Sequence, residues 1–552
     1  METTPPPPSR TLLLLLLVLA AVWFSNLEYR KLIRPDEGRY AEIAREMAVT
    51  GDWITPRLNG IKYFEKPPLQ YWATAAAFRA FGPHEWTARL WPALTGFLGI
   101  LLIAFTGGRL YGATAGLYAG LVVAGSAGYI VIGHLNTLDM GLTLFMTGTL
   151  SGLLLAHRPG ANDAEERRWM LVAWGSAALA VLSKGLIGIV LPAGVAAVYI
   201  LIERDFRLLR RAHWTAGSLL FLALAAPWFV LVQLANPEFA RFFFVHEHFQ
   251  RFLTTVARRI EPWWYFVPIL VVLVTPWLTL LPQALTSAWR KQDSDGAFQP
   301  GRFLLIWAVF IFVFFSASHS KLASYILPIL PALALLIGAQ LARMEPRKFR
   351  GHALAILALG AGIVAISPIM TRFAKPTTPA ALLEGYVPWI AAGGGALLIG
   401  AALAVLWCRR DTLYPALTAV SLGSLVGILL IGTGHNALSR SYSGYYLANA
   451  IKPYLDPGIP FYSVRTYDQT LPFYIGRTMT LVAHDGEMNY GLEQEPRLGI
   501  PTIEGFESVW RRAPHALAIM EPATYQLLKQ RGLPMRIIAR DLRRIVVAKP
   551  AP

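Results

Sequence analysis

The residues best suited to chemistry gather in one loop near the N-terminus. The segment PDEGRYAEIAREM brings Asp36 and Glu37 directly after an apolar block, and the same loop later carries Tyr63, Glu65 and Lys66. Carboxylates at the edge of an apolar block cost free energy unless they are solvated, paired or used. A solvated pair that merely ends the block is the simplest alternative, so the neighbouring residues decide how the loop is interpreted.

Those neighbours favour a functional site with fixed side chains over a solvated loop. Arg39 adds a cation to the loop, and two prolines, Pro67 and Pro68, follow the Glu65 and Lys66 pair. Proline restricts its own backbone and that of the residue before it. We therefore expect Glu65 and Lys66 to point in fixed directions, which a purely solvating loop would not require.

Two further polar residues stand at the edges of apolar blocks. Asp139 lies in HLNTLDMGL, and Tyr325 lies beside Lys321 in SHSKLASYILP. Taken alone, Asp139 is explained more simply as the N-cap of the helix that follows it.

A second aromatic loop, RFFFVHEHFQRF, contains His246, Glu247 and His248 together with Arg251. Histidine and glutamate are common metal ligands, but this spacing is not a strong metal-binding motif. A metal site and a plain polar loop both remain open at this stage.

Carboxylates, cations and aromatics on one side of a membrane, without a Gly-rich nucleotide fingerprint, suit the cleavage of a sugar from a lipid phosphate. Lys, Arg or a divalent metal can stabilise the leaving phosphate, while a carboxylate positions or deprotonates the nucleophile. The lipid-linked donor already carries the activation that a nucleotide sugar would bring, so no nucleotide cofactor is expected.

The elements that position these residues are membrane helices. The chain has 552 residues, of which 55% are hydrophobic and only 15% charged, whereas soluble domains have about 25% charged residues. Its apolar residues form blocks of roughly 17 to 22, the length that crosses the hydrocarbon core as a helix. The net charge of +17 fits basic cytoplasmic loops better than nucleic-acid binding.

We expect about thirteen spans. They lie near residues 11–26, 88–107, 112–133, 139–156, 169–182, 185–202, 215–234, 264–284, 303–317, 324–341, 352–370, 387–407 and 414–433. Basic residues concentrate in the short loops of one side, which places the N-terminus in the cytoplasm and the C-terminus outside. The first block could instead be a cleaved signal peptide, although no clean cleavage site follows it.

The predicted organisation is a transmembrane domain over residues 1–434, with long outer loops at 27–87 and 235–263, and an outer α/β domain over 435–552 in which strands alternate with helices. In the first loop, apolar residues such as Tyr40 and Met47 repeat at helical spacing opposite Glu42 and Glu46, which predicts a helix lying in the membrane interface. The outer domain is expected to support the loops.

The sequence resembles the lipid-carrier-dependent glycosyltransferases of the GT-C fold, and among them the family of lipid A aminoarabinose transferases of Gram-negative bacteria. The resemblance covers nearly the whole chain and rests on PDEGRYAEIAREM, GDWITPRLNGIKYFEKPPLQYW, HLNTLDMGL, SKGLIG and SHSKLASYILP. The first two segments are long and specific. The resemblance implies a polytopic α-helical membrane protein with a small C-terminal α/β periplasmic domain.

It also implies roles for individual residues. The matching positions are Asp36 and Asp139 as catalytic carboxylates, Lys66, Tyr63, Arg251, Tyr325 and Arg39 at the carrier phosphate, and Glu65 and His246 as ligands of a divalent metal ion. An acceptor phosphate is largely ionised and needs no strong general base. We therefore expect Asp36 to position the sugar, for example through its ammonium group.

The implied activity is the inverting transfer of 4-amino-4-deoxy-L-arabinose from undecaprenyl phosphate to lipid A phosphates at the periplasmic face of the inner membrane, a modification associated with resistance to polymyxin and other cationic antimicrobial peptides. A monomer is expected. The nearest alternative is a polyprenyl-phosphate-dependent mannosyl- or arabinosyltransferase that acts on protein or glycan hydroxyls. A lipid or sugar transporter is a weaker alternative, because no internal repeat is visible and the best charges lie at one face.

Overall fold

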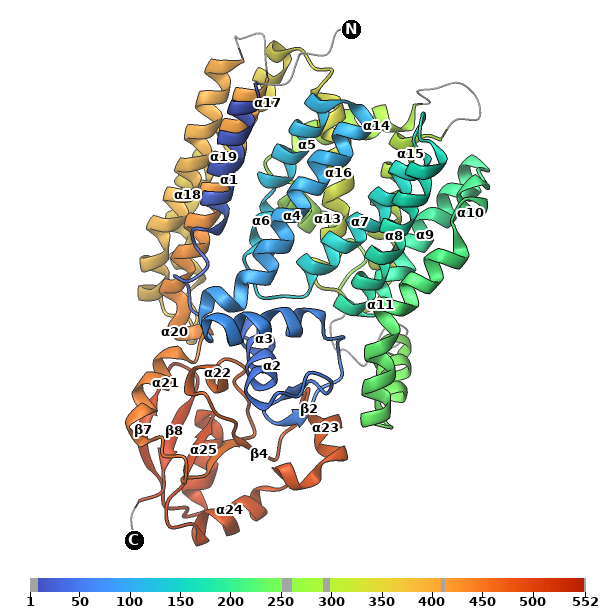
Figure 1. Cartoon of the computed structure of the whole chain (residues 1–552). Coiled ribbons are helices and arrows are strands. Elements are labelled where there is room, and N and C mark those ends of the chain that lie inside the picture. The colour runs from blue at the N-terminus through green and yellow to red at the C-terminus, as the bar shows by residue number, and fades with distance from the viewer. Residues whose placement is uncertain (1–7, 251–260, 291–297, 409–412, 551–552) are drawn as a thin grey trace.

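The structure, a computed structural model, describes residues 8–250, 261–290, 298–408 and 413–550, with the side chains of 246–250 outside that description. A bundle of helices forms one end of the molecule and an α/β domain forms the other (Figure 1). The described chain begins at the start of α1, at the end of the bundle away from the α/β domain, and it ends within the α/β domain. The two ends therefore lie on opposite sides, as the charge distribution predicts.

The bundle contains every helix that the apolar blocks predict. Its helices are α1 (Ser9–Phe24), α4 (Glu85–Tyr111), α5 (Ala113–Ala124), α6 (Ala127–Gly133), α7 (Asp139–His157), α8 (Asp163–Lys184), α9 (Ile187–Glu203), α10 (Arg207–Arg210), α11 (Trp214–Ala235), α13 (Phe266–Val274), α14 (Leu281–Trp289), α15 (Pro300–Ala317), α16 (Leu330–Leu341), α17 (Pro346–Ile366), α18 (Ala380–Trp407) and α19 (Tyr414–Gly434). Short 3-10 turns and a π-helix, η1 (Arg241–Gln250), join or extend them.

Among the described residues, eight helices are long and apolar enough to cross a membrane, or ten if each of two bent pairs is one span. The first bent pair is α5 with α6, which are bent by 64° relative to each other. The second is α13 with the helical segment Leu278–Trp289, which ends in α14, and these are bent by 105°. Of the other predicted spans, α1 and α9 are apolar but shorter, and α8 has charged residues in its first turns. The expectation of a polytopic helical membrane protein is confirmed.

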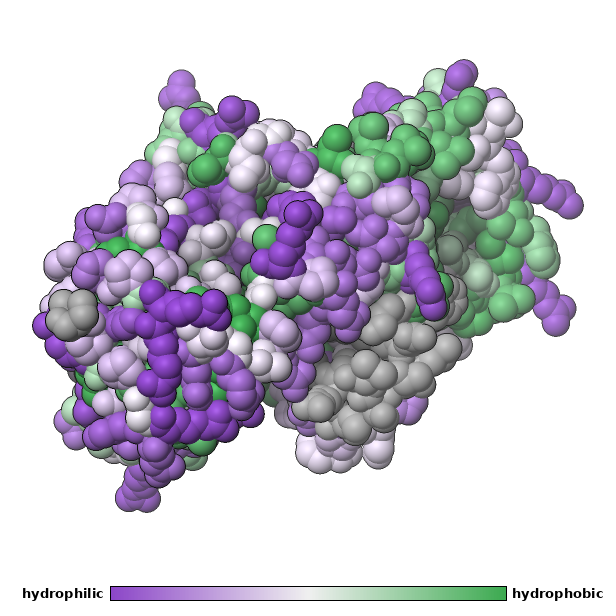
Figure 2. Space-filling model, turned by 90° about the horizontal axis from the view of Figure 1, so that it is seen from below, coloured by the Kyte–Doolittle hydropathy of each residue, from purple (hydrophilic) through white to green (hydrophobic). Residues whose placement is uncertain are grey.

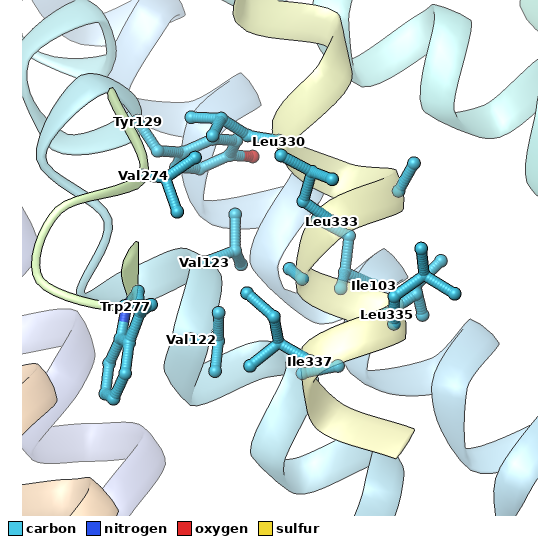
Figure 3. Packing of buried hydrophobic residues seen from close by; sticks show 14 of the residues in the cluster. Ile103, Val122, Val123, Tyr129, Val274, Trp277, Leu330, Leu333, Leu335 and Ile337 are labelled. Carbon is cyan, nitrogen blue, oxygen red and sulfur yellow. The ribbon is translucent and has the colours of Figure 1, made fainter. Parts of the chain in front are cut away.

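The centre of the bundle is closely packed. Leu330, Leu333 and Ile337 of α16 lie beside Val122 and Val123 of α5 (Figure 3), and all five are at most 3% exposed. In lipid no hydrophobic effect drives helices together, so close packing must hold them in contact. Small residues allow these two helices to approach closely enough for that packing.

The first block is part of this core. Trp23 of α1 is fully buried and donates a hydrogen bond from Nε1 to the carbonyl of Ala93 in α4 at 2.8 Å. Its ring also packs against the imidazole of His134, with centroids 4.7 Å apart. A cleaved signal peptide would leave this core incomplete, so the structure favours a retained first span.

An outer layer lies between the bundle and the α/β domain (Figure 1). It consists of α2 (Asp36–Thr50), the hairpin of β1 (Arg57–Leu58) and β2 (Ile61–Lys62), and α3 (Leu69–Phe81). The helix predicted for the first long loop is therefore present as α2, and α3 is a second helix of the same loop.

The α/β domain has a six-stranded sheet in the order β5-β4-β3-β6-β8-β7, in which β5, β4, β3 and β6 are parallel and β8 and β7 are antiparallel to their neighbours. The strands are β3 (Phe461–Val464), β4 (Thr480–Val482), β5 (Gly499–Ile500), β6 (Leu517–Met520), β7 (Arg536–Arg540) and β8 (Ile545–Ala548). The accompanying helices are α20 (Ser439–Tyr442), α21 (Tyr445–Ile451), α22 (Leu471–Ile475), α23 (Asn489–Gln494), α24 (Ile503–Arg512) and α25 (Pro522–Gln530).

The helix predicted in the first long loop forms as α2, but its charged face is covered by protein and does not face solvent, as it would in a helix lying in the membrane interface. Glu42, Arg45 and Glu46 are all at most 8% exposed. Arg45 donates to both carboxylate oxygens of Glu42, at 2.6 and 2.7 Å, and to the carbonyl of Gly476 in the α/β domain. The backbone amide of Gly60 in the hairpin donates to Glu46 at 2.7 Å. The polar face is thus covered by protein, a contact between distant segments that helical periodicity cannot reveal.

Close packing of α16 gives a test of the fold. A Cβ added at Gly338 would lie 2.6 Å from the backbone nitrogen and 2.7 Å from the Cβ of Ala119, whereas one added at Gly362 in α17 meets nothing within 4 Å. We expect Gly338→Ala to destabilise the protein by about 1–3 kcal/mol, because the helices must separate. Gly362→Ala, which gains the same helix propensity, should be neutral or slightly stabilising. Thermal unfolding in detergent compares the two, and equal melting temperatures would contradict the packing described.

Candidate active site

A buried carboxylate anchors the start of α2. Glu37 is 1% exposed and accepts hydrogen bonds from two arginines. Arg30 donates at 2.7 and 3.0 Å, and Arg89 of α4 donates at 2.8 and 3.1 Å. The backbone amides of Ile33 and Asn136 donate at 3.0 and 3.2 Å. The alternative of a solvated pair is therefore wrong for Glu37, because both of its oxygens are satisfied by protein.

These contacts join four parts of the chain. Arg89 also donates to the carbonyls of Leu27 and Arg30, at 2.7 and 2.6 Å, so α4 is tied to the segment between α1 and α2. Burial alone would raise the pKa of the Glu37 carboxyl, but the charges of Arg30 and Arg89 reverse that effect and hold the pKa well below its usual range. The carboxylate is therefore ionised at every physiological pH.

Asp36, the preceding residue, has the opposite environment. Its side chain is 41% exposed, and it accepts one hydrogen bond, at 2.9 Å, from Nη1 of Arg39. Nε of Arg39 lies 2.7 Å from a carboxylate oxygen of Glu487, which belongs to the α/β domain. Arg39 is therefore held between two carboxylates, one from α2 and one from the C-terminal domain.

Glu487 connects Arg39 and Asp36 to further side chains. It accepts a hydrogen bond from the Tyr63 hydroxyl at 3.4 Å and one from Nε2 of Gln469 at 3.0 Å. Burial raises the pKa of the Glu487 carboxyl, Arg39 opposes this rise, and the nearby Glu65 carboxylate adds to it.

A cleft of about 320 Å³ opens beside these residues. Its lining includes Arg39, Glu65, Gln469, His484 and Glu487, so it draws on both the first outer loop and the C-terminal domain. Surfaces of this outer side are largely hydrophilic, and hydrophobic surface gathers at the right-hand edge of the view (Figure 2). The cleft is therefore a polar pocket at the junction of the two parts.

Two further tyrosines stand behind the cleft. Tyr40 and Tyr71 pack with ring centroids 6.0 Å apart and are at most 8% exposed. Within the described part of the chain, no hydrogen-bond partner reaches the buried Tyr71 hydroxyl. Burial and the neighbouring Glu65 carboxylate raise the pKa of Tyr71, so the phenol stays protonated and can donate.

Lys66 lies in the first outer loop, next to Glu65. Its Nζ donates to the backbone carbonyl of Glu65 at 2.8 Å, and the two prolines that follow are buried. The stiff backbone expected from the sequence is thus present, with α3 beginning at Leu69.

Asp139 and Tyr325 form a second group through a shared lysine. Asp139 is the first residue of α7, and the N-cap position is occupied by Leu138. The Asp139 carboxylate pairs instead with Nζ of Lys184 at the end of α8. The same Nζ lies 4.9 Å from the centre of the Tyr325 ring. The simpler interpretation of Asp139 as an N-cap is therefore wrong.

The two groups are neighbours. Leu138, which precedes Asp139, packs in one apolar cluster with Tyr40, Tyr63 and Tyr71. Gln70 of α3 also donates to the side-chain oxygen of Asn136 at 2.6 Å. The structure thus assembles segments from four separate regions of the chain at one outer edge of the bundle.

Two predicted residues cannot be placed. Arg251 lies outside the described residues, and so does the side chain of His246. Among the residues that are described, no group of three or more His, Cys, Asp and Glu side chains is arranged to hold a metal. The metal and the Arg251 contact stay predictions.

Sequence reasoning missed several members of the site, of which Glu487 and Lys184 form ion pairs within it. Glu487 gave no signal, because a single glutamate in GEMNYG looks like any surface residue. Lys184 had a weak signal, since SKGLIG carries one of the few cations at the outer ends of the spans. Its pairing with Asp139 depends on how α7 and α8 pack.

Comparisons with known proteins agree with this architecture. Residues 8–243 match a family model described as dolichyl-phosphate-mannose-protein mannosyltransferase, and residues 447–549 match one described as aminoarabinose transferase C-terminal domain. The crystal structure of ArnT from Cupriavidus metallidurans bound to undecaprenyl phosphate matches with a TM-score of 0.94 and 38% identity, covering 99% of both chains.

Curated relatives are similar over shorter stretches. The undecaprenyl phosphate-alpha-4-amino-4-deoxy-L-arabinose arabinosyl transferase 1 of Proteus mirabilis is 32% identical over 407 residues, which span 70% of this chain and 71% of that protein. The corresponding transferase 2 of Pseudomonas fluorescens is 34% identical over 348 residues, which span 60% of this chain and 57% of that protein.

A bundle of apolar helices with a mannosyltransferase-type N-terminal part, joined to an outer α/β domain at a carboxylate-rich cleft, defines an integral membrane glycosyltransferase of the GT-C fold. Within that class, the chain belongs to the undecaprenyl phosphate-4-amino-4-deoxy-L-arabinose arabinosyl transferase family. The fold class predicted from the sequence is confirmed.

The two adjacent carboxylates should respond differently to neutralisation. We expect Glu37→Gln to destabilise the protein by about 3–5 kcal/mol, because it leaves two buried guanidinium groups without their counter-ion. Asp36→Asn removes one exposed ion pair and should cost at most about 1 kcal/mol. Denaturant unfolding in detergent measures both.

The pH dependence of the stability difference between the wild type and Glu37→Gln tests the depressed pKa of Glu37. A carboxylate with a depressed folded-state pKa contributes stability that is fully present above its ordinary pKa of about 4.3 and is lost only as pH falls below that value. The stability gap between the wild type and Glu37→Gln should therefore be constant from pH 8 to pH 5. A gap that shrinks across this range would show that Glu37 is not held ionised.

Proposed function

We propose that the chain transfers 4-amino-4-deoxy-L-arabinose from undecaprenyl phosphate to the phosphate groups of lipid A, at the periplasmic face of a Gram-negative inner membrane. The observation that carries the proposal is the match along nearly the whole chain to a structure of ArnT bound to undecaprenyl phosphate. The polar cleft at the junction of the outer loop and the C-terminal domain supplies a matching site.

The reaction is a displacement at the anomeric carbon. A lipid A phosphate oxygen forms a bond to that carbon while the bond from the carbon to the carrier phosphate oxygen breaks, and the electron pair leaves with undecaprenyl phosphate. Attack opposite the leaving group inverts the configuration. The charge that develops on the leaving phosphate is what the enzyme must stabilise.

Several side chains at the outer edge of the bundle carry donors that suit that phosphate. Lys66 carries a cation beside Glu65, and the Tyr63 hydroxyl and the Arg39 guanidinium lie in the Glu487 cluster. Lys184 and Tyr325 form the neighbouring group, and Arg251 is assigned to the same role by family resemblance. Because Arg39 is shared by two carboxylates, we infer that it orients Asp36 as well as adding positive charge.

In this proposal Asp36 binds and positions the sugar. A phosphate acceptor is already ionised, so no strong base is required. A half-exposed carboxylate oriented by Arg39 can pair with the ammonium group of the sugar and align the anomeric carbon. The buried Glu37 next to it fixes the start of α2 and therefore the direction of Asp36.

The acceptor separates this function from its nearest alternative, a transferase that glycosylates hydroxyl groups. The match of residues 447–549 to an aminoarabinose transferase domain favours the phosphate acceptor. Purified protein with carrier-linked radiolabelled aminoarabinose should label lipid A and leave a hydroxyl-bearing peptide unlabelled. Lipid A stripped of its phosphates should also stay unlabelled.

Replacing Asp36 tests its role directly. We expect Asp36→Asn to lower kcat by at least about a hundredfold, since positioning and electrostatic stabilisation each supply factors of this order. Binding of undecaprenyl phosphate should change little, and Asp36→Glu should restore part of the rate. Steady-state kinetics and a carrier-lipid binding assay give the two readouts. Near-normal transfer by Asp36→Asn would refute the role.

A divalent ion remains part of the proposal. Glu65 lines the cleft and offers the carboxylate oxygens that such ions accept, and His246 is the second ligand that the family resemblance implies. The ion would supply positive charge at the leaving phosphate. Elemental analysis of the purified protein should find a divalent ion that Glu65→Gln loses, while Glu495→Gln, which removes a carboxylate paired with Arg57, keeps it. Equal metal content in both variants would contradict the assignment.

A further inference from the structure

A second polar cavity lies at the opposite end of the bundle from the α/β domain. It has a volume of about 230 Å³ and is lined by the end of α7, the segment after it, and α10. The charged residues in its lining are Arg158, Asp205, Arg207 and Arg211. Positive-inside reasoning places this end of the bundle in the cytoplasm.

Carboxylates hold the three arginines in place. Arg158 donates to both oxygens of Glu165, at 2.9 and 3.0 Å, Arg207 donates to both oxygens of Asp205, at 2.7 and 2.8 Å, and Arg211 donates to Glu166 at 2.8 Å. A guanidinium group has five N–H donors, so one carboxylate does not saturate it. The Arg207 and Arg211 side chains are 51% and 55% exposed. Fixed, half-exposed guanidinium groups suit a phosphate.

An imidazole adds a second observation. His157 lines the same cavity, and its Nδ1 contacts the carbonyl of Leu153 at 3.0 Å. Its Nε2 is buried, and within the described chain no group hydrogen-bonds to it. Because Nδ1–H donates to the Leu153 carbonyl, the neutral ring presents Nε2 as an acceptor, which a hydroxyl group of a ligand headgroup in the cavity would satisfy.

An apolar groove begins directly beside this cavity. It has a volume of about 190 Å³ and runs between α7, α8, α9 and α10, with a lining that includes Leu153, Ala193, Ala196, Leu208 and Leu209. The single-turn helix α10 borders both sites, because Arg207 lines the cavity while Leu208 and Leu209 line the groove. The polar and apolar sites are therefore two ends of one surface.

The groove has the length of one membrane leaflet. Along α9 its lining extends from Ile189 to Ile200, which at 1.5 Å per residue is about 16 Å. Half of a hydrocarbon core of about 30 Å is about 15 Å. Trp214, which is 55% exposed, stands at the α10 end, and tryptophan marks the membrane interface. The arginine cavity thus lies at headgroup level and the groove at acyl-chain level.

We propose that this surface is a binding site for an anionic phospholipid of the cytoplasmic leaflet, with the phosphate in the arginine cavity and one acyl chain in the groove between α8 and α9. Leu209, which is 45% exposed, and the exposed Ala193 both line the groove, so part of the groove lies at the surface of the bundle. A free anion would use the cavity alone, whereas a phospholipid uses both parts. The site is separate from the cleft at the outer face.

Binding of phosphatidylglycerol and phosphatidylcholine to the detergent-purified full chain, measured by native mass spectrometry, tests the proposal. The wild type should prefer phosphatidylglycerol. In Arg207→Gln and Arg211→Gln that preference should fall about fivefold per arginine, the factor expected for one basic residue at a lipid headgroup. Ala193→Phe, which fills the groove, should weaken binding of both lipids.

Matched controls exist on the same side of the molecule. Arg347→Gln and Arg350→Gln remove exposed arginines from α17, and Ala197→Phe adds a ring to α9 outside the groove lining. These three variants should bind as the wild type does, and melting temperatures without lipid confirm that each variant folds.

Three outcomes would overturn the proposal. They are an unchanged lipid preference in Arg207→Gln and Arg211→Gln, unchanged lipid binding in Ala193→Phe, and displacement of phosphatidylglycerol by inorganic phosphate at the same concentration. The last outcome would assign the cavity to a free anion. Because the readout is lipid binding, failure here leaves the proposed transfer reaction untouched.

Discussion

The buried carboxylate of Glu37 is the interaction on which the outer half of the molecule depends. Its two oxygens accept from Arg30 and Arg89 and from the backbone of two further segments. Charges at a membrane edge are costly when unpaired, so each partner is stable there only because the others are present. The end of the first span, the start of α2, and α4 are consequently held in one arrangement.

That arrangement gives two adjacent carboxylates different environments. Successive residues at the start of a helix point in different directions, so Glu37 turns into the protein while Asp36 stays 41% exposed beside the cleft. The buried residue cannot take part in transfer, and the exposed residue contributes little to stability. A site held on a rigid base needs no rearrangement of that base during the reaction, which is the condition for effective electrostatic stabilisation.

The C-terminal domain completes the cleft as well as supporting the loops. Glu487 contacts Arg39, and the Gly476 carbonyl accepts from Arg45 on the buried polar face of α2. Burial and the neighbouring Glu42 carboxylate raise the pKa of Glu46 on that face, so α2 tolerates this environment only while the domain and the hairpin supply its partners. The cleft is therefore complete only with the domain in contact with α2 and the first outer loop.

Local sequence determined the parts that depend on local physics. Apolar blocks long enough to cross a bilayer predicted the helices, basic loops predicted the orientation, and alternating strands and helices predicted the outer α/β domain, because each of these follows from the residues of one segment. The loop from Asp36 to Lys66 was likewise recognisable as unusual. Only the tertiary structure decided which charges pair: Glu37 with Arg89, Asp139 with Lys184, and Arg39 with Glu487. The partners in these pairs lie far apart along the chain, and a long-range ion pair leaves no periodic trace in the sequence around either member.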